Sequence, residues 1–137
     1  GPLPIFYQRL KDGKQCFVTK SRRDYVYVKD LVRVVLQACD GVGHGAYHFS
    51  SGTDIAIQEL YDAVVNAMGL SVKPMADVRE LHPDDVFSIL LDPMRTLEDF
   101  GNIQFTPLQE TVSAAVEYFK KYGTQGEYTH LREQHKK

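Results

Sequence analysis

The feature that most constrains the fold is a pair of segments with an apolar stripe at helical spacing, each followed by a glycine. The first stripe repeats at i, i+3, i+4, i+7 and i+11 and consists of Ile57, Leu60, Tyr61, Val64 and Met68. The second consists of Leu108, Val112, Ala115, Val116 and Phe119. Gly69 and Gly123 follow these stripes, and glycine commonly ends helices. The pattern predicts two helices, each with one buried face.

Shorter segments between and around these helices carry strand and helix signals. We expect a short helix that opens at Pro4 and stops at Gly13, and another with Asp30 in its first turn that continues to Cys39. We expect strands over residues 14–19, 24–28, 46–50 and 72–78. The last would lie near a sheet edge, because Pro74 interrupts it. This alternation indicates the α/β class, with a small sheet and packed helices.

Three helix starts are predicted from capping residues. Thr53 or Asp54 would cap the helix that contains the first stripe. Asp92 would cap a short helix that has Pro93 at its first position and stops at Gly101. A capping box over residues 106–109, with proline at the first helical position, would start the last helix.

Composition narrows the class of protein. The 137 residues are 43% hydrophobic and 25% charged, with a formal net charge of −2. This balance gives no electrostatic basis for binding nucleic acid or an anionic membrane, and a membrane-spanning helix needs an apolar run of about 18 residues that the sequence lacks. We expect no signal peptide. Cys16 and Cys39 have no CxxC spacing, so we expect two buried, unpaired thiols in a reduced, cytoplasmic compartment.

Two patterns suggest cofactor chemistry, but each has a plainer explanation. The glycine-rich loop 41–45 leaves a helix and enters a strand, whereas a dinucleotide loop leaves a strand and enters a helix. Tyr7 and Lys11 have the Tyr-x-x-x-Lys spacing of short-chain dehydrogenases, but no glycine-rich strand–helix unit precedes them. A connecting loop and an ordinary helix face are the favoured interpretations.

Two further clusters could hold a metal or a pair of catalytic acids. His44 and His48 are four residues apart without a neighbouring ligand pattern, so a structural or surface role is favoured. Asp84 and Asp85 are best explained as loop acids.

Arg22 and Arg23 are the strongest chemical candidates. From the residues alone, a phosphate-binding guanidinium and a surface ion pair are equally good explanations.

A longer pattern begins at the second of these arginines. Residues 23–30, Arg-Asp-Tyr-Val-Tyr-Val-Lys-Asp, resemble the Arg-Asp-(Phe/Tyr)-(Val/Ile)-(Tyr/His)-Val-x-Asp motif of extended short-chain dehydrogenases, the nucleotide-sugar epimerases and dehydratases. Residues 13–17, 47–52 and 83–86 resemble three further family segments in the same order. The resemblance covers nearly the whole chain. Among members of the family, the sequence most resembles the bacterial sugar epimerases of surface-polysaccharide pathways.

This resemblance assigns roles to particular residues. Arg23 matches the arginine that binds the diphosphate of the nucleotide sugar, and Phe17 matches an aromatic position at the base. Backbone groups near Gln15 would also meet the base. Leu3 and Pro4 match the substrate-facing start of the preceding helix.

Two positions depart from the family pattern. His82 stands where the family has its second phosphate-binding arginine, so this contact is lost or is supplied elsewhere, with Arg79 as the candidate. His48 replaces the asparagine of the family's Tyr-Asn motif. The resemblance places no catalytic, cofactor-binding or metal-binding residue in this chain.

The resemblance also implies an organisation and an activity. Residues 1–122 would form the substrate-binding, C-terminal part of a Rossmann-type extended short-chain dehydrogenase, and residues 123–137 a polar tail. The intact enzyme would be a homodimer that epimerises a UDP- or GDP-linked sugar by transient oxidation, with NAD bound by an N-terminal half. The alternatives are a nucleotide-sugar 4,6-dehydratase or reductase, and a binding module without chemistry.

Overall fold

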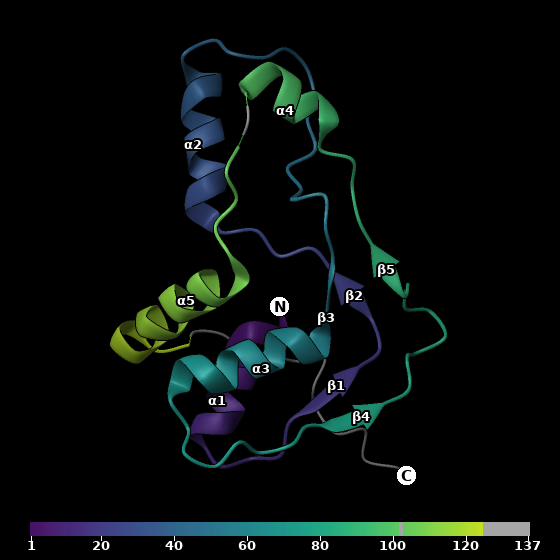
Figure 1. Cartoon of the computed structure of the whole chain (residues 1–137), viewed down its shortest axis with the longest axis vertical. Helices are drawn as coiled ribbons and strands as arrows, with labels where there is room; N and C mark the ends of the chain where they lie inside the picture. Colours follow the sequence, from purple (N-terminus) through teal and green to yellow (C-terminus); the bar gives the residue numbers. More distant parts are fainter. Residues whose placement is uncertain (102, 125–137) are drawn as a thin grey trace.

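The computed structural model describes residues 1–101 and 103–124 of the chain, and most of the proposed tail lies outside them. The described helices are α1 (Pro2–Lys11), α2 (Val28–Cys39), α3 (Ile57–Met68), α4 (Met94–Phe100) and α5 (Leu108–Tyr122). The strands are β1 (Phe17–Thr19), β2 (Arg22–Arg23), β3 (Ile55–Ala56), β4 (Asp77–Arg79) and β5 (Ser88–Ile89). Helices α1, α3 and α5 gather at one end of the molecule, and α2 and α4 lie at the other (Figure 1).

The core forms where α3 packs against α1, α5 and β1. Both predicted stripes are confirmed: Leu60 and Val64 of α3 and Val112 and Val116 of α5 are fully buried. Gly69 ends α3 with φ 67° and ψ 32°, the left-handed conformation that glycine adopts without a steric cost. Helix α1 begins at Pro2, two residues before the predicted start, because Pro2 already occupies the first helical position that proline favours.

The strands form two small sheets. Strand β1 pairs in parallel with β4, and β2 lies between antiparallel β3 and parallel β5. The strand predicted over 14–19 exists only at residues 17–19, and the strand predicted over 72–78 begins only at residue 77 and continues to residue 79. The α/β class is confirmed.

The strand predicted over residues 24–28 is wrong. β2 ends at Arg23, and the chain then leaves the sheet. The carboxylate of Asp24 accepts hydrogen bonds from the hydroxyls of Ser50 and Ser51 and from the Ser51 backbone N–H, at 2.6–2.8 Å. α2 begins soon afterwards, at Val28. The β-branched and aromatic residues that suggested a strand thus form a linker and the first turn of a helix.

The strand predicted over residues 46–50 is also wrong, because its carbonyl groups bond side chains instead of a neighbouring strand. Arg95 of α4 donates to the carbonyl oxygens of His44 and Ala46, and the Thr96 hydroxyl donates to that of His48 at 2.6 Å. In the described part of the chain this segment pairs with no strand. Helix α4 therefore holds this segment as a connection outside both sheets.

None of the three predicted caps forms as predicted. Helix α4 begins at Met94 with Pro93 at the N-cap, one residue later than predicted, although the Met94 N–H donates to the Asp92 carboxylate at 2.9 Å. Neither Thr53 nor Asp54 caps α3, which begins at Ile57 and whose Glu59 carboxylate accepts from the Ala56 N–H at 2.7 Å. The capping box predicted before α5 does not form. Thr106 instead donates its N–H and its hydroxyl to the buried carboxylate of Asp30.

Helix α2 has an apolar side that the described chain leaves uncovered. Its Val28, Leu31, Val32, Val35 and Leu36 are 37–62% exposed. Cys39 at its last position is exposed, so the prediction of two buried thiols holds only for Cys16. The exposure follows from position, since no described element covers this side of the helix. Among the described residues, no helix has both the length and the apolarity needed to cross a membrane.

Candidate functional site

The site begins at the parallel pair of β1 and β4. Thr19 is the register partner of Arg79, and Phe17 lies two residues earlier on the same strand. Alternate residues of a strand share a face, so the Arg79 side chain reaches Phe17 diagonally. Its guanidinium carbon lies 3.8 Å from the centroid of the Phe17 ring. Two residues named from the sequence are thereby brought into contact as a cation–π pair.

A pocket of about 360 Å³ opens beside Phe17. The first turns of α1 form one wall and β1 forms another. Its lining includes Pro2, Ile5, Phe17, Thr19, Ser21 and Asp85. A pocket of this size, mostly apolar with a few polar groups, is typical of small-ligand sites. Of these lining residues only Phe17 was assigned to the substrate from the sequence. Pro2 and Ile5 flank Leu3 and Pro4, which the sequence assigned to the substrate-facing start of the helix. That assignment was the signal that could have indicated Pro2 and Ile5.

Gln15, two residues before Phe17 in sequence, joins β1 to its neighbours through hydrogen bonds. Its side-chain amide donates to the Met75 carbonyl at 2.7 Å and to the Asp77 carboxylate at 3.3 Å. Its backbone carbonyl accepts from the Arg9 guanidinium at 2.7 Å. These contacts join the entrance of β1 to α1 and to β4. They hold the backbone that carries Phe17.

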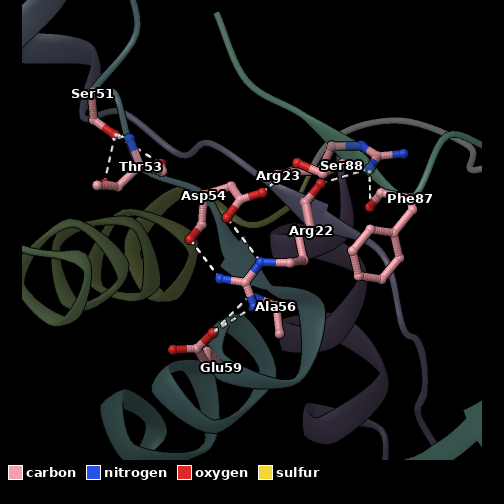
Figure 2. Close-up of polar contacts among 9 residues, drawn as sticks. All are labelled: Arg22, Arg23, Ser51, Thr53, Asp54, Ala56, Glu59, Phe87 and Ser88. Atoms are coloured by element: carbon pink, nitrogen blue, oxygen red, sulfur yellow. Dashed lines mark hydrogen bonds and ion pairs between the residues drawn. The ribbon is translucent and has the colours of Figure 1, made fainter.

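Arg22 forms the ionic centre of the second sheet (Figure 2). Its Nε lies 2.8 Å from Asp54 Oδ1, and its Nη2 donates to the Asp54 carbonyl at 2.8 Å. Ser88 donates to the other oxygen of the same carboxylate. The hydrogen bond from Ser88 and then that from Arg22 lower the pKa of Asp54 below its ordinary value. Arg22 is thus the surface ion-pair partner that the sequence left as one of two explanations.

Arg23 leaves the strand in the opposite direction (Figure 2). Its Nη1 donates to the carbonyl oxygens of Arg22 and Phe87, at 2.6 and 3.3 Å. Within residues 1–101 and 103–124, its Nε and Nη2 have no hydrogen-bond partner. Arg23 also lines a smaller hollow of about 180 Å³ with Ser50 and Ile89. The guanidinium is therefore oriented by backbone carbonyls and keeps donors available for a ligand.

The connection between β4 and β5 links the Phe17 pocket to Arg23. Asp85 on this connection lines the pocket, and the Phe87 carbonyl accepts from Arg23. His82 is exposed on the same connection, where its Nδ1 accepts from the Asp84 N–H at 3.2 Å. Arg23 and Phe17 do not line one pocket, but one short segment both lines the Phe17 pocket and accepts a hydrogen bond from Arg23. His82 lies on that segment without reaching either pocket.

Leu3 and Pro4 lie on α1 but do not line the Phe17 pocket. Leu3 packs against the core and lines a groove of about 620 Å³ along α5, together with Val26, Tyr27 and Tyr118. Pro4 is half-buried. The structure therefore does not bring these two residues together with Phe17, Arg79 or Arg23.

The plainer interpretation of the Tyr-x-x-x-Lys spacing agrees with the geometry. Tyr7 is 3% exposed and packs against Phe119, which is a core position. Burial raises the pKa of Tyr25, next to Arg23 and Asp24, to about 12, so this phenol stays protonated near neutral pH. In the described ranges no three His, Cys, Asp or Glu side chains could together hold a metal ion.

Comparisons with known proteins show what the chain is similar to. No family model matches the chain. The Bordetella bronchiseptica enzyme WbmH, solved in complex with NAD+, is 69% identical with a TM-score of 0.87, over 90% of this chain and 41% of that one. WbmG of the same organism, solved with NAD and UDP, is 31% identical with a TM-score of 0.77, over 90% and 40%. UDP-glucose 4-epimerase of Mycolicibacterium smegmatis is 28% identical over 88% of this chain and 39% of the epimerase.

In fold the chain matches the C-terminal part of Rossmann-type extended short-chain dehydrogenases, and UDP-sugar epimerases are among the proteins to which it is similar. Dehydratases and reductases also occur among the matched proteins. The chain spans about two fifths of the length of the proteins that it matches. The part of the NAD-bound neighbours that holds the cofactor is the N-terminal part, which this chain does not cover.

Proposed function

We propose that this chain is the nucleotide-sugar-binding part of an NAD-dependent UDP-sugar epimerase. The observation that carries the proposal is the arrangement of Phe17 at a pocket and Arg23 beyond it, joined by the β4–β5 connection. An aromatic ring suits a nucleobase, and a guanidinium suits a diphosphate. WbmG, solved with NAD and UDP, supports uridine as the nucleoside.

Arg23 contributes charge-assisted hydrogen bonds to the diphosphate in this proposal. The Arg22 and Phe87 carbonyls hold one guanidinium nitrogen, which leaves the Nε and Nη2 edge for two phosphate oxygens. A planar fork in this orientation matches bidentate recognition of phosphate. Because the side chain is already oriented, binding costs little additional conformational freedom.

The remaining chemistry is assigned to polypeptide outside this sequence. NAD would supply the hydride transfer, and the proton-transfer groups would lie with it on an N-terminal domain. We expect the 137-residue chain to give no turnover with NAD and UDP-sugars, and the intact enzyme to be a cytoplasmic homodimer. A dehydratase or reductase is the second candidate, supported by a sequence match of 24% identity to a dTDP-4-dehydro-6-deoxyglucose reductase.

Titration of UDP into the complete polypeptide tests the role of Arg23. Arg23→Ala should weaken binding by about 2–3 kcal/mol, or roughly 30- to 150-fold. Arg23→Lys should recover only part of the loss, because it keeps the charge without the fork. The affinity for NAD should stay unchanged.

A suitable control must remove a cation without damaging the sheet. Arg22→Ala is unsuitable because Arg22 holds Asp54 at 2.8 Å. Lys73 is exposed, and no described carboxylate forms an ion pair with it. Lys73→Ala should therefore bind UDP like the wild type. Equal UDP affinities of the wild type and Arg23→Ala would refute the proposed diphosphate contact.

A further inference from the structure

The Phe17 ring has two different neighbours. The Arg79 guanidinium covers it at 3.8 Å from the ring centroid, and the 360 Å³ pocket opens beside it. Arg79 is not among the described residues that line this pocket. A ligand in the pocket would therefore meet Phe17, while Arg79 would act on the ligand through the ring.

Arg79 makes no other polar contact within the described part of the chain. No carboxylate there forms an ion pair with it, and no hydrogen-bond partner of its guanidinium is found there. Its neighbour Glu80 pairs instead with Lys20, at 3.5 Å. The whole of β4 is exposed, so burial does not explain the position of the Arg79 side chain. The attraction between a cation and the face of an aromatic ring does.

We propose that Arg79 is a positioning residue for nucleobase recognition, and this inference rests on the proposed function. Its guanidinium holds the Phe17 ring in one orientation, so that the ring presents a fixed surface to a uracil in the pocket. A surface fixed before binding loses less conformational freedom when the base stacks on it. The competing role is a direct contact between Arg79 and the diphosphate, in place of the arginine that His82 replaces.

The two roles predict different dependence on phosphate number. Uridine, UMP and UDP are titrated into the complete polypeptide and its Arg79→Ala variant. A residue that acts through Phe17 should weaken all three ligands by the same factor, about two- to fivefold for an exposed cation–π pair. A residue that touches the diphosphate should have little effect on uridine and a growing effect on UMP and UDP.

A double-mutant cycle tests the dependence on the ring. Phe17→Leu should weaken UDP binding by about five- to 150-fold, the range for loss of a stacked base. In that background Arg79→Ala should have no further effect, because the ring through which it acts is gone. Lys20→Ala removes a neighbouring cation that does not contact Phe17, and it should behave like the wild type. Circular dichroism verifies that each variant is folded.

The outcomes separate the inference from the proposed function. A factor that rises from uridine to UDP, or an Arg79→Ala effect that persists without Phe17, would overturn the positioning role while leaving UDP binding intact. Failure of the wild type to bind UDP, or unchanged UDP binding by Phe17→Leu, would overturn the proposed nucleotide site and this inference with it.

Discussion

Helices α3 and α2 have the same length and opposite surroundings. Each has 12 residues with a strong apolar side. The apolar side of α3 is buried between α1 and α5, where Leu60 is 0% exposed. The apolar side of α2 faces outward, with Leu36 59% exposed. An amphipathic pattern shows that a face will be buried, but it does not specify which polypeptide will bury it.

The attachment of α2 explains how it stays ordered without burying its apolar side. The Asp30 carboxylate, which is fully buried, accepts from the Thr106 N–H and hydroxyl and pairs with Arg33 at 2.6 Å. These contacts join the first turn of α2 to the segment that leads into α5. Polar contacts at one end thus fix the helix, while its apolar side remains available to other polypeptide. We expect this apolar surface to be covered by other polypeptide.

The largest expected effect is a loss of folding stability, which two matched Leu→Ala changes in the 137-residue chain should show to very different degrees. Leu60→Ala should lower the free energy of unfolding by about 2–5 kcal/mol, because it leaves a cavity in the core. Leu36→Ala should change it by less than about 0.5 kcal/mol, as expected for an exposed side chain. Urea unfolding followed by circular dichroism measures both. Similar losses for the two variants would show that α2 is covered within this chain.

A smaller effect should appear when the same α2 change is made in the complete polypeptide. If α2 packs there against an NAD-binding domain, Leu36→Ala should cost about 2 kcal/mol, since three carbon groups lose their buried environment. The 137-residue chain should also self-associate, as measured by light scattering. Val72, which is 79% exposed and lies outside the α2 face, provides the control. Val72→Ala should be silent in both forms, and an equally silent Leu36→Ala would remove the proposed interface.

Local patterns predicted the helices well because the responsible signals lie within each helix. The stripes of α3 and α5 recur every three or four residues, and glycine follows each. The misplaced caps show the limit of such signals. Asp54 has the side chain of a good N-cap, yet it pairs with Arg22 and Ser88, which are 32 and 34 residues away. A distant cation decided its role, and no window around Asp54 contains that information.

The residues of the candidate site could be named from the sequence, but their arrangement could not. Arg23 and Phe17 were identified because family motifs surround them. Their separation into two hollows depends on how β4 and β5 pair with β1 and β2. The contact between Arg79 and Phe17 likewise depends on the parallel register of two strands distant in sequence. The strand predicted over residues 46–50 failed for the related reason that a strand requires a partner, and the described chain offers none.

The smallest expected effect concerns acid stability of the second sheet, in the Asp54 cluster. The pKa of Asp54 is lowered mainly by the hydrogen bond from Ser88, and the hydrogen bond from Arg22 is the next largest cause. A carboxyl group whose pKa is lower in the folded state stabilises the fold above its unfolded pKa, and this contribution is lost as pH falls through the folded pKa. Asp54→Asn should therefore be less stable than the wild type near neutral pH, and the difference should shrink below about pH 4.

Urea unfolding from pH 7 to pH 2 measures this difference, and two further variants assign it. Ser88→Ala removes the largest cause of the shift, so its deficit should also shrink on acidification. Asp62 is an exposed acid on α3 that accepts from Gln58 at 2.9 Å, and Asp62→Asn should follow the wild type at every pH. A deficit of Asp54→Asn that stays constant down to pH 2 would mean that shape and packing at this position matter, and that the charge of the cluster does not. The second sheet would then depend on strand pairing alone, and the contrast between its ionic centre and the apolar core around α3 would no longer hold.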